Sequence, residues 1–269
     1  MVPMVDNFLY YLKVFSIVIY NSLIKELTFR FNITIRIMTD ITWYLVNILF
    51  FQVIYLNSNT ILGWNLGEVM LFLGTMFIID SLHMSFFYFN TLQIPYYIRT
   101  GLLDSFLIKP INTRFLISIR NINFSSLFNA AFGIFVVSLS IQELDLTLNF
   151  FYITIYILFI INGVLIMYSI LFIGATLSIY FSRTEGLMNT FFEIFQFGMK
   201  PDIIYEGTVK FVMTYIIPVL VIVNFPTKIL LNKLSIINSL WGFGISILLL
   251  IISHVFWKIS LKKYTSATS

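Results

Sequence analysis

The sequence contains no cysteine and is poor in histidine and in charge. None of its 269 residues is a cysteine, and only His83 and His254 carry an imidazole. Disulfides and thiolate metal sites are therefore excluded, and two histidines on separate segments are too few for a zinc or iron centre. Charged residues make up 10% of the chain, against about 25% in soluble domains. A chain with so little charge cannot cover its own surface with polar groups in water.

Hydrophobic residues take the place of the missing charge. They make up 59% of the chain, and the mean hydropathy is +0.94, so we expect the protein to lie in a lipid bilayer. We predict an all-α, polytopic membrane protein in which residues 1–269 form a single domain. A spanning helix needs about 20 mostly apolar residues, and crossings are expected at residues 35–56, 68–89, 117–141, 150–181, 185–199 and 235–257. Gly242 and Gly244, inside the last of these, are expected to allow close helix packing.

The fifth region is apolar but broken. Its run from residue 187 to residue 231 is interrupted by Pro201, Pro218 and Pro226. Backbone at membrane depth must satisfy its hydrogen bonds, so such a break needs shelter from protein or water. We therefore predict that the short crossing helix leads to an external segment, residues 200–226, with re-entrant half-helices at about residues 202–224. The alternative is an interfacial helix followed by one span that is kinked at a proline.

The N-terminal segment, residues 1–33, has the pattern of an amphipathic helix. Apolar side chains recur at steps of three and four, at Phe8, Leu12, Phe15, Ile19, Leu23 and Leu27. Lys13, Asn21 and Lys25 fall largely off that stripe. Because its continuous hydrophobicity is modest, this helix is expected to lie along the membrane surface. The alternative, a seventh span over residues 14–24, is too short for a bilayer.

Basic residues are distributed unevenly among the predicted loops. With the N-terminus inside, twelve of the 16 lysines and arginines face the cytoplasm, and those outside are Lys200, Lys210, Lys228 and Lys233. The loop 57–67 has no base, and the loop 142–149 carries only acids. Since cytoplasmic loops retain positive charge, both termini are predicted to be cytoplasmic.

The stretch RTGLLDSFLIKPINTRF, Arg99 to Phe115, differs from the apolar runs on either side of it. It holds four charges, a glycine and a proline. Ile98, Leu102 and Phe106 can share one face of a short helix, which Pro110 cannot continue. The pattern predicts a helix lying across the cytoplasmic ends of two spans, within the loop 91–113. The alternative is an ordinary basic loop that only fixes topology.

This stretch resembles the signature of six-span permeases of the ATP-binding-cassette type-two exporter class. There a Gly-x-Leu-Asp stretch leads to a Leu-x-basic-Pro segment, and the matching positions here are Gly101, Leu103, Asp104, Leu107, Lys109 and Pro110. A second patch is similar to the family's segment of Pro-x-x-Ile-Tyr, a later Ile-Pro and a last proline, at Pro201, Tyr205, Pro218 and Pro226. Leu102 departs from the pattern, because relatives often carry an acid there.

The resemblance implies a dimeric permease core, made of two identical or related chains, in a bacterial cell membrane. Two cytoplasmic ABC ATPase subunits would hold ATP and Mg²⁺, since this chain lacks a GxxxxGK[ST] loop and is expected to bind no cofactor itself. Coupling to the ATPases is expected of Arg99, Gly101, Asp104, Lys109 and Pro110. The expected function is outward movement of an amphiphile (a drug, lipid, peptide or lipopeptide), with no nucleic-acid partner.

Ionisable residues inside the predicted spans are candidates for the translocation path. Asp80 and His83 are three residues apart and share a helical face, which suggests either a hydrogen-bonded structural pair or a proton relay. Glu193 either lines the pore or pairs with a base. The resemblance and the breaks in the fifth region suggest an outer gate at Pro201, Tyr205 and Pro218.

Two other function classes stay open at this stage. An intramembrane lipid-modifying enzyme would need a cluster of catalytic side chains within the spans, and only Asp80 and His83 approach one. A secondary transporter often shows inverted repeats, and no repeat is evident in this sequence.

Overall fold

Helices make up the regular secondary structure of the residues described. The computed structural model describes residues 8–28, 30–56, 60, 63–147, 149–181 and 185–265. Every element in these ranges is an α-helix or a short 3-10 or π-helix. Six of the helices are long and apolar enough to cross a membrane. The predicted all-α, polytopic class is therefore confirmed.

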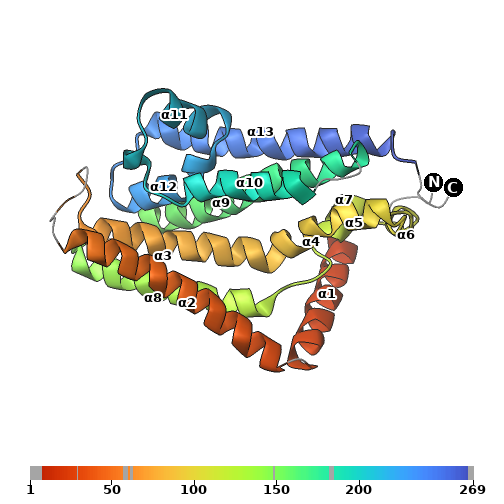
Figure 1. Ribbon diagram of the computed structural model, residues 1–269, viewed down its shortest axis with the longest axis horizontal. Helices are drawn as coiled ribbons and strands as arrows, with labels where there is room; N and C mark the ends of the chain where they lie inside the picture. The colour runs from red at the N-terminus through yellow and green to blue at the C-terminus, as the bar shows by residue number, and fades with distance from the viewer. Residues whose placement is uncertain are drawn as a thin grey trace.

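Five long helices run lengthwise through a bundle (Figure 1). They correspond to predicted spans and are α2 (Arg30–Tyr55), α3 (Leu66–His83), α8 (Phe124–Glu143), α9 (Phe150–Thr176) and α13 (Ile236–Leu261). A π-helical turn, η1 (Met84–Tyr88), and α4 (Phe89–Leu92) prolong α3. The third region was predicted to begin at residue 117 with a polar part at the interface, and that part does not belong to the spanning helix. There α7 (Thr113–Ser118) is a separate helix, and Asn123 caps the start of α8.

α3 and α8 pack backbone against backbone. The reason is a pair of facing glycines, Gly74 on α3 and Gly133 on α8. A Cβ on Gly74 would lie 2.9 Å from the amide nitrogen of Val137, and one on Gly133 would lie 2.9 Å from that of Ile78. Small residues at such contacts allow the close van der Waals packing that drives helix association in lipid. α3 and α9 are the most buried of the long helices and form the centre of the bundle.

α1 (Phe8–Thr28) lies across one end of the bundle, at a steep angle to the long helices (Figure 1). Its 21 residues are long and apolar enough to cross a bilayer, so the argument that a span here would be too short is wrong. Tyr11, Ser22 and Glu26 face the protein. Much of the predicted apolar stripe is exposed instead, at Phe8, Leu12, Leu23 and Leu27. An interfacial position, which suits this arrangement, stays a prediction.

The broken fifth region consists of short helices joined by sharp turns. The bounds of α10 (Glu185–Gly198) match the short helix expected at residues 185–199. With 14 residues α10 is not among the six candidate spans, so its crossing of the membrane stays a prediction. The elements that follow α10 are η3 (Asp202–Ile204), α11 (Gly207–Phe211), η4 (Val212–Ile216) and α12 (Val219–Leu230). The chain bends by 89° between the segment Gly207–Ile216 and α12. α12 continues through Pro226 to Leu230, past the predicted end of the half-helices. Both predicted arrangements of this region, re-entrant or kinked, contain such a bend.

The two ends of the bundle differ in the elements that they carry (Figure 1). α5 (Ile94–Arg99), α6 (Asp104–Leu107) and α7 gather where α1 lies and where α13 ends. We call this the termini end. α11 lies at the opposite end, which we call the cap end. The assignment of the termini end to the cytoplasm stays a prediction.

Candidate translocation groove and coupling segment

A cavity of about 410 Å³, which we call the polar cavity because the carboxylates of Asp40 and Asp80 line it, lies among α2, α3, α8 and α10, toward the termini end. Five of its polar side chains are linked by hydrogen bonds between neighbouring helices. The Asn129 amide donates to the Asp40 carboxylate at 2.5 Å, and the Tyr44 hydroxyl lies 3.1 Å from the Ser81 hydroxyl and 3.5 Å from the Asp80 carboxylate. Two carboxylates therefore face this cavity from α2 and α3.

A second, mostly apolar cavity of about 360 Å³ continues toward the cap end. Trp43, Gln196 and Met199 line both cavities, which therefore adjoin between α2 and α10, and we refer to the two together as the groove. The apolar cavity also contains Phe50, Phe51, Ile54, Met76 and Ile204. The carboxylates of the groove, Asp40 and Asp80, thus lie in the polar cavity, whereas the apolar cavity has no carboxylate among the described residues of its lining and has Asn47 and Lys200 among its polar residues.

Asp80 and His83 do not form the expected pair. Asp80 points into the polar cavity toward Tyr44 on α2. The buried His83 ring packs instead against Tyr88 and Phe195, with ring centroids at 5.9 and 6.4 Å, and its two nitrogens have no hydrogen-bond partner among the described residues. Residues three apart on a helix are separated by about 60° around its axis, and here that difference is enough to direct the two side chains to different neighbours.

Glu193 lies apart from the groove. It is exposed on α10, whereas Phe192 and Gln196 on the same helix line the polar cavity. Glu193 forms no ion pair among the described residues. An exposed carboxylate on an otherwise apolar helix is costly against lipid, so this face of α10 is unsuited to full contact with the bilayer.

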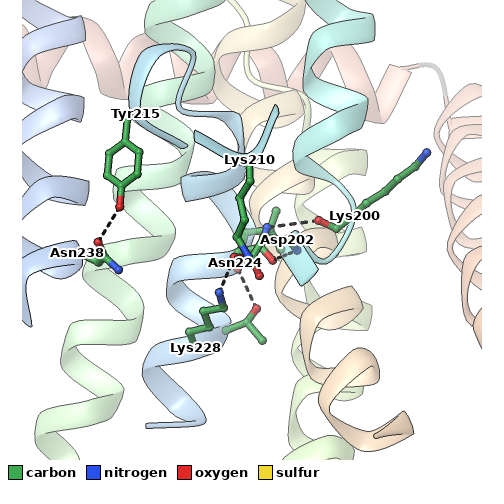
Figure 2. Close-up of polar contacts among 9 residues, drawn as sticks. Lys200, Asp202, Lys210, Tyr215, Asn224, Lys228 and Asn238 are labelled. Carbon is green, nitrogen blue, oxygen red and sulfur yellow. Dashed lines mark hydrogen bonds and ion pairs between the residues drawn. The ribbon is translucent and has the colours of Figure 1, made fainter. Parts of the chain in front are cut away.

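A polar cluster ties the fifth region together at the cap end (Figure 2). The Asp202 carboxylate binds Lys228 of α12 at 2.5 Å and Lys210 of α11 at 3.4 Å. The Asp202 amide donates to the Asn224 side chain at 2.7 Å, and Asn224 in turn donates to the Lys200 carbonyl at 3.3 Å. Figure 2 shows the Lys200 side chain pointing away from this cluster. The sequence analysis missed the cluster, although an asparagine inside the apolar run at 219–225 was a usable signal.

The predicted gate residues lie at the junction of α10 and α12. Buried Pro201 precedes η3, and its carbonyl accepts from the Ile204 amide at 3.2 Å. The Tyr205 hydroxyl donates to the Phe197 carbonyl at 3.0 Å, near the end of α10. Buried Pro218 is the cap of α12. The structure thus brings Pro201, Tyr205 and Pro218 into one region, while Asp80, His83 and Glu193 lie elsewhere.

The coupling segment is two short helices rather than the single helix expected. Gly101 stands between α5 and α6 with φ +71°, a conformation that side chains rarely adopt. The Leu103 amide then donates to the Tyr97 carbonyl at 3.0 Å. The expected face of Ile98, Leu102 and Phe106 is wrong at one position, because Leu103 is fully buried and Leu102 is 44% exposed. Because Gly101 has a left-handed backbone, the helical period of α5 does not continue into α6. The buried leucine is therefore Leu103, one residue after the expected Leu102.

The matching motif positions have evident structural roles. Gly101 makes the turn, Leu103 anchors it, and Asp104 stands in the first turn of α6. Pro110 follows the end of α6, and Lys109 lies over the Phe106 ring at 5.3 Å.

A family model described as ABC-2 family transporter protein matches residues 41–268. The chain belongs to the ABC-2 transporter family. The resemblance inferred from the motifs is confirmed, and the protein is a multi-pass membrane permease component of an ABC transporter, a class that works with an ABC ATPase subunit. The family assignment favours a permease over the two other classes that the sequence left open. Comparisons with curated proteins and with solved structures give no match.

Arg114 connects the coupling segment of this ABC-2 permease to its core. From α7 it donates to the Tyr168 hydroxyl on α9 at 3.1 Å and to the Ser253 hydroxyl on α13 at 2.7 Å. Its guanidinium also lies 4.6 Å from the Phe172 ring. Sequence reasoning placed Arg114 among the topology-setting bases and missed this role. The signal was a single base followed by the apolar residues FLI.

Hydrogen bonds from three side chains attach α1 to the same region. The Tyr11 hydroxyl accepts from the Asn112 amide at 3.3 Å. Ser22 accepts from the Ile122 amide at 3.0 Å, and Glu26 accepts from the Phe124 amide at 2.9 Å. α1 therefore contacts both sides of α7 and the start of α8 in the permease.

Proposed function

We propose that this permease exports an amphiphile through the groove between α2 and α10. The observation that carries the proposal is that the polar and apolar cavities adjoin at Trp43, Gln196 and Met199. The polar part of an amphiphile would lie near Asp40 and Asp80, and its apolar part among the aromatic side chains beyond. A small ion would instead need a polar-lined filter. Drugs, lipids, peptides and lipopeptides all belong to this substrate class.

A second permease chain, identical or related, is part of the proposal. Exposed apolar residues follow α2 along its length, including Met38, Val46, Phe50 and Val53, and Glu193 is exposed on the neighbouring α10. A second chain packed against α2 and against the exposed face of α10 would cover Glu193 and complete the translocation path.

ATP hydrolysis is assigned to separate cytoplasmic ATPase subunits, which would hold the ATP and Mg²⁺. Their docking surface is proposed at α5 and α6, where apolar and basic side chains are exposed together: Arg99, Leu102, Leu107, Ile108 and Lys109. Gly101 and Pro110 would shape this surface, and Asp104 would orient it. Arg114 would then transmit movement from this segment to α9 and α13.

The experiment is to fill the groove with a bulky side chain. Met199→Trp would occupy the joint between the two cavities, and Ile247→Trp on the exposed face of α13 is the matched control. Both variants are reconstituted with the partner ATPase, and transport of a panel of fluorescent amphiphiles is measured. We expect strong loss of transport for Met199→Trp alone, with insertion and melting temperature retained in both. Equal transport by the two variants would contradict the proposal.

A further inference from the structure

A second, basic hollow adjoins the polar cavity at the termini end. It has a volume of about 580 Å³ and lies among α1, the first turns of α2, α5 and the segment that joins α7 to α8. Its charged lining residues are Lys25, Glu26, Arg36 and Arg120. We call this hollow the basic basin. Of these four residues, only Arg36 also lines the groove, so the basin can be tested separately from the proposed transport path.

The basin carries more positive than negative charge, although Lys25 and Arg36 interact electrostatically with Glu26, and Arg36 also with Asp40. Lys25, Arg36 and Arg120 form no ion pair among the described residues. The single carboxylate of the basin, Glu26, is turned toward the start of α8, where it accepts from the amides of Phe124 and Ser125 at 2.9 and 3.5 Å. Three cations therefore face the hollow with one partly engaged carboxylate.

The two arginines are held in place by aromatic rings. The Arg36 guanidinium lies 5.8 Å from the Phe89 ring, and the Arg120 guanidinium lies 5.3 and 5.2 Å from the Tyr97 and Phe106 rings. Arg120 also donates to the Tyr97 hydroxyl at 2.8 Å. This bond uses one of the five N–H groups of a guanidinium, and a fixed guanidinium is well suited to bidentate binding of phosphate.

The position of the basin suits the polar surface of a membrane. Arg36 stands in the second turn of α2, close to the start of its apolar run, and exposed apolar residues of α1 flank Lys25, among them Leu23, Ile24 and Leu27. Basic pockets between helices at this level bind the headgroups of anionic lipids.

We propose that the basic basin binds a phosphate-bearing anion at the membrane surface, and its position favours the headgroup of an anionic phospholipid as the source. The bound phosphate would link α1, α2 and the α7–α8 segment, which carry Lys25, Arg36 and Arg120 respectively. It would therefore stabilise the attachment of α1 to the region that contains the coupling segment.

The test uses the intact transporter complex in detergent. It is titrated with short-chain phosphatidylglycerol, with short-chain phosphatidylcholine as the neutral reference and with glycerol 3-phosphate as the free-phosphate arm, while the melting temperature is followed. The test variant is Lys25→Gln with Arg120→Gln, two residues outside the groove. The matched control is Lys13→Gln with Lys258→Gln, which removes the same charge from exposed positions outside the basin.

Phosphatidylglycerol is expected to stabilise the wild type and the control more than phosphatidylcholine does. The test variant should bind it about 30-fold more weakly, because each base near an anionic surface contributes about 1 kcal/mol. Arg120→Lys should keep part of the stabilisation by phosphatidylglycerol. If the double variant has a lowered melting temperature without ligand, Lys25→Gln alone replaces it as the test variant. Stabilisation by glycerol 3-phosphate with the same residue dependence would support the site with free phosphate as its ligand. Equal responses of test and control variants to both phosphate ligands would overturn the proposal, whatever the outcome for transport.

Discussion

At the scale of single residues, the spacing of helices in this permease depends on glycines that the sequence does not distinguish. Gly242 and Gly244 were both expected to allow close packing. A Cβ on Gly242 would lie 2.9 Å from the Phe159 ring, whereas one on Gly244 would meet nothing within 4 Å. The sequence around a glycine in an apolar run does not show which residue of another helix packs against it. That neighbour is known only once the helices are placed relative to one another.

One such contact explains how Pro226 is accommodated inside α12. A proline has no N–H, so it leaves the carbonyl four residues earlier, that of Ile222, without a helical donor. Gly163 of α9 lies against that carbonyl, where a Cβ would come within 2.7 Å of the oxygen. The absence of a side chain at Gly163 allows this approach, in which a Cα–H contact can partly replace the lost hydrogen bond.

Gly198 gives the sharpest prediction at this scale. A Cβ there would lie 2.9 Å from the Val219 carbonyl carbon and closer still to its oxygen, whereas Gly244 has open space around it. We expect Gly198→Ala to destabilise the fold by about 1–3 kcal/mol through overpacking. Gly244→Ala should be neutral or stabilising by up to about 1 kcal/mol, through helix propensity. Thermal melting of both purified variants is the measurement, and equal melting temperatures would show that α10 and α12 can separate at little cost.

At the scale of elements, the long helices were predictable because uninterrupted apolar runs leave little choice in lipid. The short elements were harder to predict from the sequence. The predicted coupling helix failed at Gly101, since its left-handed backbone ends α5 and places Leu103, not Leu102, in the core. The groove was not predictable at all. It depends on which side chains of α2 and α10 face each other, and α10 is too short and broken for its periodicity to show this.

The coupling segment can be tested by reversing one charge. Asp104→Arg should leave membrane insertion and protein amount normal, because this residue lies at the termini end, outside the bundle core. It should weaken ATPase association or uncouple hydrolysis from transport, and co-purification with ATPase assays measures both. Lys258→Gln on the exposed face of α13 is the control. Normal coupling in the Asp104 variant would reduce the segment to a topology-setting loop.

At the scale of the whole molecule, the charge bias between the two ends is stronger than the number of bases suggests. Of the four lysines predicted to lie outside, Lys210 and Lys228 share Asp202, and Lys233 binds Glu68 at 2.5 Å. Positive charge at the cap end is thus partly neutralised by acids of the fold. These pairings of lysines with acids were not apparent from the sequence.

Cysteine labelling tests this orientation directly, because the natural chain has no cysteine. Thr147 is exposed between α8 and α9, and Ser105 is exposed on α6 at the termini end. In intact cells, Thr147→Cys should react with a membrane-impermeant thiol reagent, and Ser105→Cys should react only after the membrane is permeabilised. The reverse pattern would invert the proposed topology and with it the direction of transport.

The direct backbone contact between α3 and α8 has a consequence for the transport cycle. Two helices that meet at Gly74 and Gly133 without intervening side chains cannot slide past each other without losing that fit, so they should move as one rigid body. Alternating access would then fall to the helices on either side of the groove. The contact between Gly198 and the Val219 carbonyl joins the end of α10 to α12 in the same way, so α10 should move together with α12 against the stationary pair formed by α3 and α8.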